Sequence, residues 1–226
     1  MNTIVPPTNI DFAAARRHMV ESQLRPNRVT DPRVLGAMRS LPRERFLPEA
    51  LAAFAYLDDD VPLGGGRVLM EPLALARLVQ LAAPRNGELA LVVGAGTGYG
   101  AAVLAACGAN VTAIEEDDRL LGIARAVLPA LAPGVQLIKA PLVGGWRAGG
   151  PWHIALIEGS APQIPAAIVE QLSRESGRLV TVLAAADQLG RAVIGRPSLG
   201  GLAIHSAFDC ATPVLPALIP PPVFTF

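Results

Sequence analysis

The sequence predicts an α/β fold, a doubly wound and mostly parallel sheet of Rossmann-like type that follows an N-terminal helical extension. Between residues 89 and 183, short apolar runs alternate with helical patterns of about ten residues. A glycine-rich turn follows the first of these runs. The segment before residue 84, in contrast, reads as a series of helices. The alternation over residues 89–183 is typical of right-handed βαβ units in a parallel sheet with helices on both faces.

The composition excludes several classes of protein. Charged residues make up 17% of the 226 residues, too few for a disordered chain. The 19 basic and 19 acidic residues cancel, and a pI of about 6.8 gives no electrostatic footprint for nucleic acid or an anionic membrane. The sequence contains no apolar run of about 18 residues that could span a membrane. We therefore expect no nucleic-acid partner and no membrane partner.

The cysteines and the N-terminus indicate the compartment. Cys107 and Cys210 lie in no CxxC or Cys/His cluster, which predicts buried thiols in a reducing compartment and no metal site. The first eleven residues lack the basic and apolar regions of a secretory leader. We therefore expect a cytoplasmic protein, and nothing in the sequence indicates its oligomeric state.

The N-terminal extension is predicted to consist of three helices. Asn9 or Asp11 can cap the first, and the run Thr30-Asp31-Pro32 is a strong start signal for the second. The expected helices cover residues 12–23, residues 32–41 and a short segment after Pro48. This extension, with the loop that follows it, forms residues 1–83 and is expected to pack on the α/β domain, residues 84–226.

The α/β domain is predicted from its alternating pattern. The expected strands cover residues 89–93, 110–114, 135–138, 154–157 and 178–183, and the expected helices cover residues 71–81, 99–107, 117–128 and 165–172. Residues 188–226 are strand-like and end in the proline run 220–222. A C-terminal strand and tail that close over the ligand pocket would fit this order, although no single residue there indicates it.

The glycine turn at residues 94–98 is the main functional signal. Glycines let the backbone turn sharply and let a ligand approach main-chain N–H groups at a helix start. Glu115 ends the next strand, 115 − 94 = 21 positions after the first glycine, where an acid can accept hydrogen bonds from ribose hydroxyls. The pattern predicts an adenosine-containing ligand. The predicted cofactor-binding residues are Gly94, Ala95, Gly96, Gly98, Tyr99, Glu115 and Glu116.

The identity of that ligand has alternatives. A dinucleotide remains open, because Gly96-x-Gly98-x-x-Ala101 matches its fingerprint loosely. A purely structural turn, with Glu115 solvated or capping, is also open. The form Gly-x-Gly-x-Gly favours S-adenosylmethionine, which has no pyrophosphate to be cradled.

A further set of motifs is spread over nearly the whole chain: LPRERF at 41–46, AY at 55–56, VPLG at 61–64, Pro72, GAGTGYGAAV at 94–103, and residues 164–165, 171–172 and 177–180. This combination is the basis of a resemblance to the protein-L-isoaspartate O-methyltransferase family. It implies a class I methyltransferase fold with S-adenosylmethionine over the glycine turn and Glu115 on the ribose. It also implies methyl transfer to the free α-carboxylate of an isoaspartyl residue in a damaged protein or peptide, a repair reaction. A carboxylate is already ionised at neutral pH, so this chemistry needs no general base.

The substrate loop departs from the family pattern G-x-G-Q-[ST]-I-S-x-P. Val68 and Met70 replace its two hydroxyl residues, and neither can hydrogen-bond a carboxylate. Arg67 and Glu71 are new charges in the same loop. Arg67 is open to two interpretations, a solvated loop residue or a bidentate clamp for a carboxylate substrate.

Two further departures lie at the ends of later strands. Ala140-Pro141 replaces a Gly-Asp that helps to hold adenine in the family, and Glu158 replaces a small or hydroxyl residue. Glu158 is open as a general base, as a contact to the donor's amino group or as a solvated strand end. No catalytic residue is assigned, and the candidates are Arg67, Glu71 and Glu158. The alternatives to isoaspartyl repair are a methyltransferase with another acceptor and a non-catalytic cofactor-binding relative.

Overall fold

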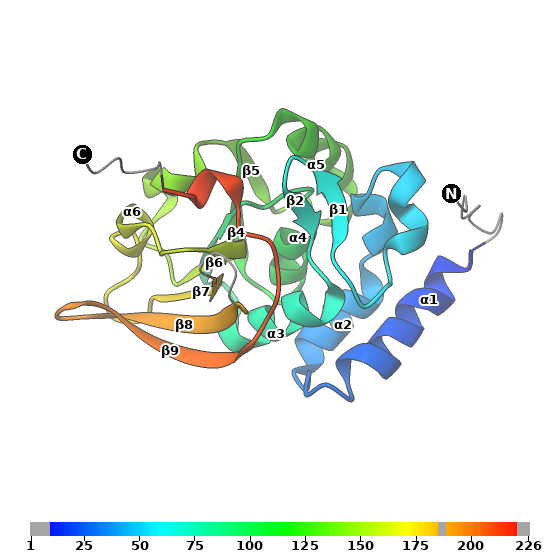
Figure 1. Cartoon of the computed structure of the whole chain (residues 1–226), viewed down its shortest axis with the longest axis horizontal. Helices are drawn as coiled ribbons and strands as arrows, with labels where there is room; N and C mark the ends of the chain where they lie inside the picture. The colour runs from blue at the N-terminus through cyan, green and yellow to red at the C-terminus, as the bar shows by residue number, and fades with distance from the viewer. Residues whose placement is uncertain (1–9, 185–188, 221–226) are drawn as a thin grey trace.

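A computed structural model describes residues 10–184 and 189–220 of the chain. A seven-stranded sheet runs in the order β5-β4-β3-β6-β7-β8-β9 (Figure 1). The first five strands in this order are parallel, and β8 and β9 are antiparallel to their neighbours. Their bounds are β3 Leu89–Val93, β4 Asn110–Glu115, β5 Gln136–Lys139, β6 Ile154–Ala161, β7 Arg178–Leu183, β8 Arg191–Ser198 and β9 Gly201–Asp209. The predicted mostly parallel α/β sheet is confirmed.

The helices also follow the sequence pattern. They are α1 Phe12–His18 with a π-helical continuation Met19–Leu24, α2 Pro32–Ser40, α3 Pro72–Ala82, α4 Tyr99–Ala106, α5 Asp118–Leu131 and α6 Ala166–Val169. Asp11 and Asp31 cap α1 and α2 through their side chains, as the start signals predict. The short helix expected after Pro48 is a 3-10 helix, Glu49–Phe54.

One predicted helix is much shorter than its pattern. The expectation of a helix over residues 165–172 is wrong beyond Val169. The chain leaves the helix there because the Gln171 carbonyl accepts a hydrogen bond from the Trp152 N–H at 2.8 Å, and Trp152 and Leu172 form a parallel bridge. Backbone pairing of residues 171–172 with Trp152 therefore limits the helix to a single turn, despite the helical propensity of the following residues.

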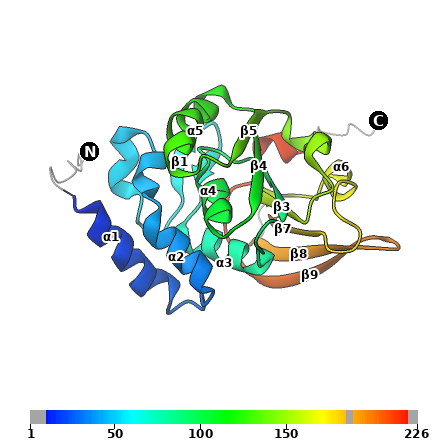
Figure 2. The ribbon, with the colours of Figure 1, turned by 180° about the vertical axis from the view of Figure 1, so that it is seen from behind.

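The C-terminal part is a hairpin followed by an irregular segment. The strand-like character expected for residues 188–226 is confirmed over residues 191–209 by β8 and β9 and is wrong for residues 210–220, which are irregular. Residue 188 and residues 221–226 lie outside the described residues. Figures 1 and 2 show this hairpin at one end of the molecule and the N-terminal helices at the other. After β9 the chain returns to the sheet and ends its described part with the 3-10 helix Pro216–Leu218.

Two hydrophobic clusters cover the two faces of the sheet. Alternate residues of β3 divide between them, Val92 in one and Leu91 in the other, as a strand buried on both faces requires. The Val92 cluster also contains residues of the N-terminal extension, among them Met19 and Met38. The extension thus packs on the α/β domain through shared core, while the division at residue 83 stays a prediction. Within the described residues, no helix is long and apolar enough to cross a membrane.

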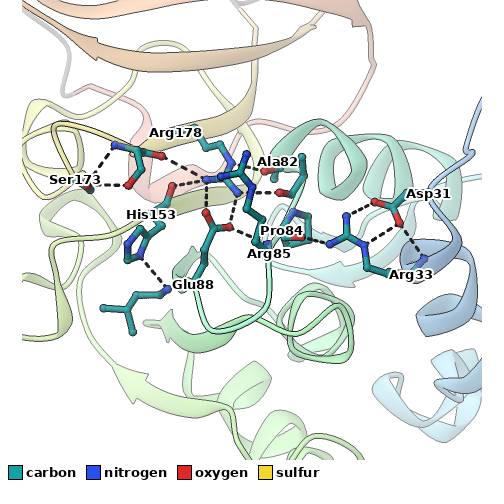
Figure 3. A network of polar contacts seen from close by, with 12 residues as sticks. Asp31, Arg33, Ala82, Pro84, Arg85, Glu88, His153, Ser173 and Arg178 are labelled. Carbon is teal, nitrogen blue, oxygen red and sulfur yellow. Dashed lines mark hydrogen bonds and ion pairs between the residues drawn. The ribbon is translucent and has the colours of Figure 1, made fainter.

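An ion pair at the amino ends of the strands ties α3 to the sheet (Figure 3). Arg178, the first residue of β7, holds Glu88 with nitrogen–oxygen distances of 2.6 and 3.1 Å. The same guanidinium donates to the carbonyls of Ala82 and Ala83 at the C-terminal end of α3. Burial alone would raise the pKa of Glu88, but the hydrogen bonds from Arg178 hold it below its ordinary value.

Candidate functional site

The glycine turn has the predicted geometry. β3 ends at Val93, the turn follows, and α4 begins at Tyr99. Gly94, Gly96 and Gly98 have φ values of 72°, 57° and 95°, a region that side chains disfavour. All residues from 94 to 99 are buried. The glycines therefore serve the backbone conformation, whatever ligand the turn accepts.

Glu115 points at this turn, as the spacing predicts. It ends β4, and its side chain is fully buried. Its Oε2 accepts a hydrogen bond from the Gly96 N–H at 2.7 Å. Its Oε1 accepts from the N–H groups of Glu116 and Asp117 at 2.9 and 3.0 Å. Three backbone donors thus fix a carboxylate beside the first turn of the predicted ligand site.

Arg67 occupies the remaining face of that carboxylate. Its Nη1 lies 2.7 Å from Glu115 Oε1 and its Nη2 lies 2.8 Å from Oε2, a bidentate pair. The same Nη2 donates to the carbonyl of Gly94 at 3.0 Å. Arg67 is only 7% exposed, so the interpretation as a solvated loop residue is wrong. The interpretation as a substrate clamp stays a prediction.

A small hairpin brings Arg67 to this place. β1 (Val61–Gly64) and β2 (Arg67–Leu69) form a separate two-stranded sheet with Gly65 and Gly66 at its turn, both at positive φ. Arg119 of α5 donates to the Leu63 carbonyl at 2.8 Å and holds the hairpin beside the main sheet. The sequence pattern alone predicts no strand in this loop. Glycines between two short β-compatible runs were the available signal.

The C-terminal segment covers the turn from the other side. The Leu215 side chain is 4% exposed and packs over both Gly94 and Gly159, where an added Cβ would lie 2.9 and 2.7 Å from it. The backbone of this segment is bonded to the end of β6. Ser160 donates to the Pro213 carbonyl at 3.1 Å, and the Ser160 carbonyl accepts from the Leu215 N–H at 2.9 Å. No feature of the sequence singled out Leu215.

Side chains of the chain itself lie where the sequence predicts the adenosine ligand. Each oxygen of Glu115 already accepts at least two hydrogen bonds, so no lone pair is left for ribose hydroxyls. Leu215 and Arg67 fill the space above Gly94 that the missing Cβ leaves free. The turn and the acid have the geometry of a nucleoside site, but the chain itself occupies it.

The hydroxyl positions of the substrate loop are apolar and largely buried. Met70 is 1% exposed, and its carbonyl accepts a hydrogen bond from the fully buried Arg43. Val68 is half-buried in β2, where it pairs with Pro62. These positions contribute packing and leave no polar group for an acceptor. Arg43, in the LPRERF motif, is a site neighbour whose role the sequence pattern does not predict.

The candidate Glu71 lies at the edge of the loop. It precedes α3, and its N–H donates to Asp60 Oδ1 at 2.7 Å. Burial, and then the neighbouring Asp60 carboxylate, raise the pKa of Glu71 to about 6. Glu71 therefore belongs to an acidic edge with Asp60, and its catalytic role stays a prediction.

Glu158 lies near the end of β6, inside the site. The residue keeps partial exposure, but its Oε2 is inaccessible and has no hydrogen-bond partner among the described residues. It packs so closely on Gly100 in α4 that any side chain there would collide with the carboxylate. Burial raises the pKa of Glu158 to about 8, although Arg67 and Arg43 act in the opposite direction. The interpretation as a freely solvated strand end is therefore wrong.

The other predicted contacts are engaged within the protein. Tyr99 is fully buried, with its ring 5.2 Å from that of Phe46 and under the guanidinium of Arg43. Glu116 Oε2 accepts from the Leu142 N–H at 3.2 Å. Ala140 is buried after β5 and offers no polar side chain. Their roles toward a cofactor stay predictions. Within the described ranges, no group of three or more His, Cys, Asp or Glu side chains could hold a metal ion.

Comparison with known proteins identifies what the chain is similar to. The family model described as protein-L-isoaspartate(D-aspartate) O-methyltransferase matches residues 14–193. Protein-L-isoaspartate O-methyltransferase 1 of Rhodopseudomonas palustris (strain HaA2) is 38% identical over 192 residues, covering 83% of this chain and 78% of the relative. The enzyme of that family from Methylorubrum extorquens (strain PA1) is 43% identical over 170 residues, covering 75% and 74%.

Solved structures share the fold. A Plasmodium falciparum chain assigned as a protein-L-isoaspartate O-methyltransferase, in complex with S-adenosyl-L-homocysteine, superposes with a TM-score of 0.74 at 18% identity. The match covers 89% of this chain and 98% of that one. A second protein-L-isoaspartate O-methyltransferase gives a TM-score of 0.75 at 19% identity, covering 88% and 65%. At this identity the likeness supports the Rossmann-like methyltransferase fold.

Proposed function

Because the chain belongs to the protein-L-isoaspartate O-methyltransferase family, we propose that it transfers a methyl group from S-adenosylmethionine to the free α-carboxylate of isoaspartyl residues in damaged proteins or peptides. The observation that carries this proposal is the glycine turn with the Glu115 carboxylate fixed against Gly96. A cytoplasmic location belongs to the proposal, and the two buried free cysteines, Cys107 and Cys210, support it.

The closed arrangement sets a condition on this activity. Since Glu115 has no free lone pair, the donor can bind only in an arrangement in which Arg67 has left the carboxylate. A released Arg67 would lie on the substrate loop, where it could take the clamp role that Val68 and Met70 cannot fill. This role rests on charge and planar bidentate geometry, which suit a carboxylate.

A groove beside the hairpin, apolar apart from Asp59 and Asp60, suits a peptide substrate. Its volume is about 320 Å³, and its lining comes from the 3-10 helix Glu49–Phe54, the following turn and the start of β1. Phe54 and Leu57 are 37% and 51% exposed there. We expect Phe54→Ala to raise KM for an isoaspartyl peptide several-fold and to leave binding of S-adenosylhomocysteine unchanged. Equal KM values would remove the groove from the proposal.

Methyl transfer to a synthetic peptide tests the function directly. The assay pairs a peptide containing one isoaspartyl residue with a peptide of the same sequence containing aspartate, both with radiolabelled S-adenosylmethionine. Transfer to the isoaspartyl peptide alone is expected. A chain that binds the donor and methylates neither peptide would sink the substrate assignment.

One observation favours a second function, methyl transfer to an acceptor that carries a proton. Glu158 Oε2 is buried without a partner, and burial raises the pKa of this acid to about 8. A general base works best when its pKa lies near the working pH. A hydroxyl or amine acceptor would use such a group, while a carboxylate would not. Loss of all transfer in Glu158→Gln, against retained donor binding, would favour this function; unchanged isoaspartyl transfer would contradict it.

A further inference from the structure

We infer that Arg67 and Leu215 are built-in competitors of the methyl donor, which lower its affinity by occupying the carboxylate and the space over the glycine turn. This inference rests on the proposed function, because it concerns the donor site of that activity. It assigns to two residues of this chain a role in setting donor affinity.

Arg67 competes for the carboxylate. A ribose would offer Glu115 two neutral hydroxyl donors, whereas Arg67 offers a bidentate, charge-assisted pair at 2.7 and 2.8 Å. Charge-assisted bonds are roughly twice as strong as neutral ones. Replacement of the guanidinium by hydroxyls therefore makes the free energy of donor binding less favourable.

The carboxylate is not dependent on Arg67 for its position. Backbone N–H groups of Gly96, Glu116 and Asp117 bind it at 2.7, 2.9 and 3.0 Å. If Arg67 leaves, Glu115 stays aimed at the turn, and Oε2, which then accepts only from the Gly96 N–H, has a lone pair for a hydroxyl donor. The site thus has two compatible states, one closed by Arg67 and one able to take hydroxyl donors.

The hairpin gives Arg67 the means to leave. β1 and β2 lie outside the seven-stranded sheet, and their turn runs through glycines at positive φ. A rotation of the long Arg67 side chain breaks no bond of the central sheet, whereas a shift of the whole hairpin would also break the hydrogen bond from Arg119 to the Leu63 carbonyl. The guanidinium is therefore held by its ion pair and its bond to Gly94 rather than by the core.

Leu215 competes for space. Its side chain is the group nearest to where a Cβ on Gly94 would lie. The next residue, Pro216, would lie 3.0 Å from a Cβ on Gly66 in the hairpin turn. The C-terminal segment and the hairpin therefore meet over the glycine turn. Opening for the donor moves the Leu215 side chain from a place where it is 4% exposed.

Calorimetric titration with S-adenosylhomocysteine, the donor without its methyl group, tests the inference. Arg67→Gln keeps a polar side chain and restores the residue of the family loop pattern, while Arg147→Gln changes an exposed arginine paired with Glu170 and serves as the matched control. We expect Arg67→Gln to bind tenfold or more tightly than the wild-type chain, and Arg147→Gln to bind equally. We expect Leu215→Ala to bind several-fold more tightly, with circular dichroism used to confirm its fold.

Arg67→Lys sharpens the result. A lysine keeps the charge but cannot form the bidentate pair, so an affinity between those of wild type and Arg67→Gln is expected. Equal or weaker binding by Arg67→Gln overturns the inference, whatever the transfer assay gives. Failure of the double variant of Arg67→Gln and Leu215→Ala to bind would overturn it as well. A variant that binds tightly but methylates no isoaspartyl peptide would instead contradict the proposed function alone.

Discussion

Two buried arginine–carboxylate pairs lie at opposite ends of the parallel strands. Arg178 and Glu88 meet at the amino ends, and Arg67 and Glu115 meet at the carboxyl ends. Both are bidentate, and in both the arginine also donates to a backbone carbonyl. The chemistry is therefore the same, and the difference lies in what surrounds each pair.

The Arg178 pair connects elements of the main fold. Arg178 begins a central strand and satisfies two carbonyls at the end of α3, which have no partner within their own helix. The Arg67 pair connects a detached hairpin to an edge of the sheet where ligands of open α/β folds bind. The same kind of ion pair can therefore be structural at the amino ends of the strands, where no ligand has to enter, and exchangeable at the carboxyl ends, where a ligand must enter.

The largest expected effect is that of Arg178→Gln. It leaves Glu88 with one backbone N–H donor, that of Arg85, and leaves two helix-end carbonyls without their donor. Breaking a buried pair in this way costs about 3 kcal/mol of unfolding free energy. Urea unfolding monitored by circular dichroism measures it. A loss below about 1 kcal/mol would show that the pair does not hold α3 to the sheet.

The acid dependence of the same pair gives an internal check. Because the pKa of Glu88 is lowered in the folded chain, the pair contributes stability above the ordinary pKa of 4.5, and this contribution is lost as the pH falls below it. Arg178→Gln should therefore lose less stability on acidification than the wild-type chain does. Equal losses of unfolding free energy on acidification in the two chains would contradict this.

Arg67→Gln is expected to cost less, about 1–2 kcal/mol, because three backbone N–H groups still bind Glu115. Binding of S-adenosylhomocysteine should also restore the stability that Arg67→Gln loses. S-adenosylhomocysteine at about 100 times its Kd stabilises a protein by ~2.7 kcal/mol, so saturated Arg67→Gln should melt at or above the temperature of the unliganded wild type. Equal losses in Arg67→Gln and Arg178→Gln would erase the distinction between the two ends of the strands.

Glu158 is a third acid, half-buried, and it lacks an ion-pair partner within hydrogen-bond distance among the described residues. Burial raises its pKa from 4.5 to about 8. The folded chain then holds a proton that the unfolded chain releases, so stability should fall as the pH rises from about 4.5 to about 8. Glu158→Gln should remove ~1–2 kcal/mol of this fall, less than the full linkage because the residue is partly exposed. Melting curves of both chains across this range measure it, and identical slopes would contradict the assignment.

The smallest effect is expected at the surface. Arg147 and Glu170 are paired at 3.0 Å, with 69% and 64% of their side chains exposed. Arg147→Gln should change the unfolding free energy by less than about 0.5 kcal/mol, because exposed pairs are screened and hold two long side chains in place. A loss near that of Arg178→Gln would mean that arginine replacement itself, rather than burial, sets the order of the three variants.

The backbone of the site could be predicted from the sequence, but the side chains that fill it, Arg67 and Leu215, could not. The turn at residues 94–98, the strand before it and the position of Glu115 follow from local pattern and from a fixed spacing along one βαβ unit. The helix expected over residues 165–172 shows where local pattern fails, since Trp152 captures the backbone after one turn. The hairpin that carries Arg67 was missed because its strands are three and four residues long.

By itself the sequence determined the fold class, the ligand turn and the acid aimed at it, because each depends on periodicity or spacing within a short stretch. The tertiary structure decided which groups face that acid. Arg67 precedes Glu115 by 48 positions and Leu215 follows it by 215 − 115 = 100, so only packing brings the three to one place. Burial then made Arg67 a partner of Glu115 instead of a solvated loop residue, since a charge withdrawn from water must find an opposite charge.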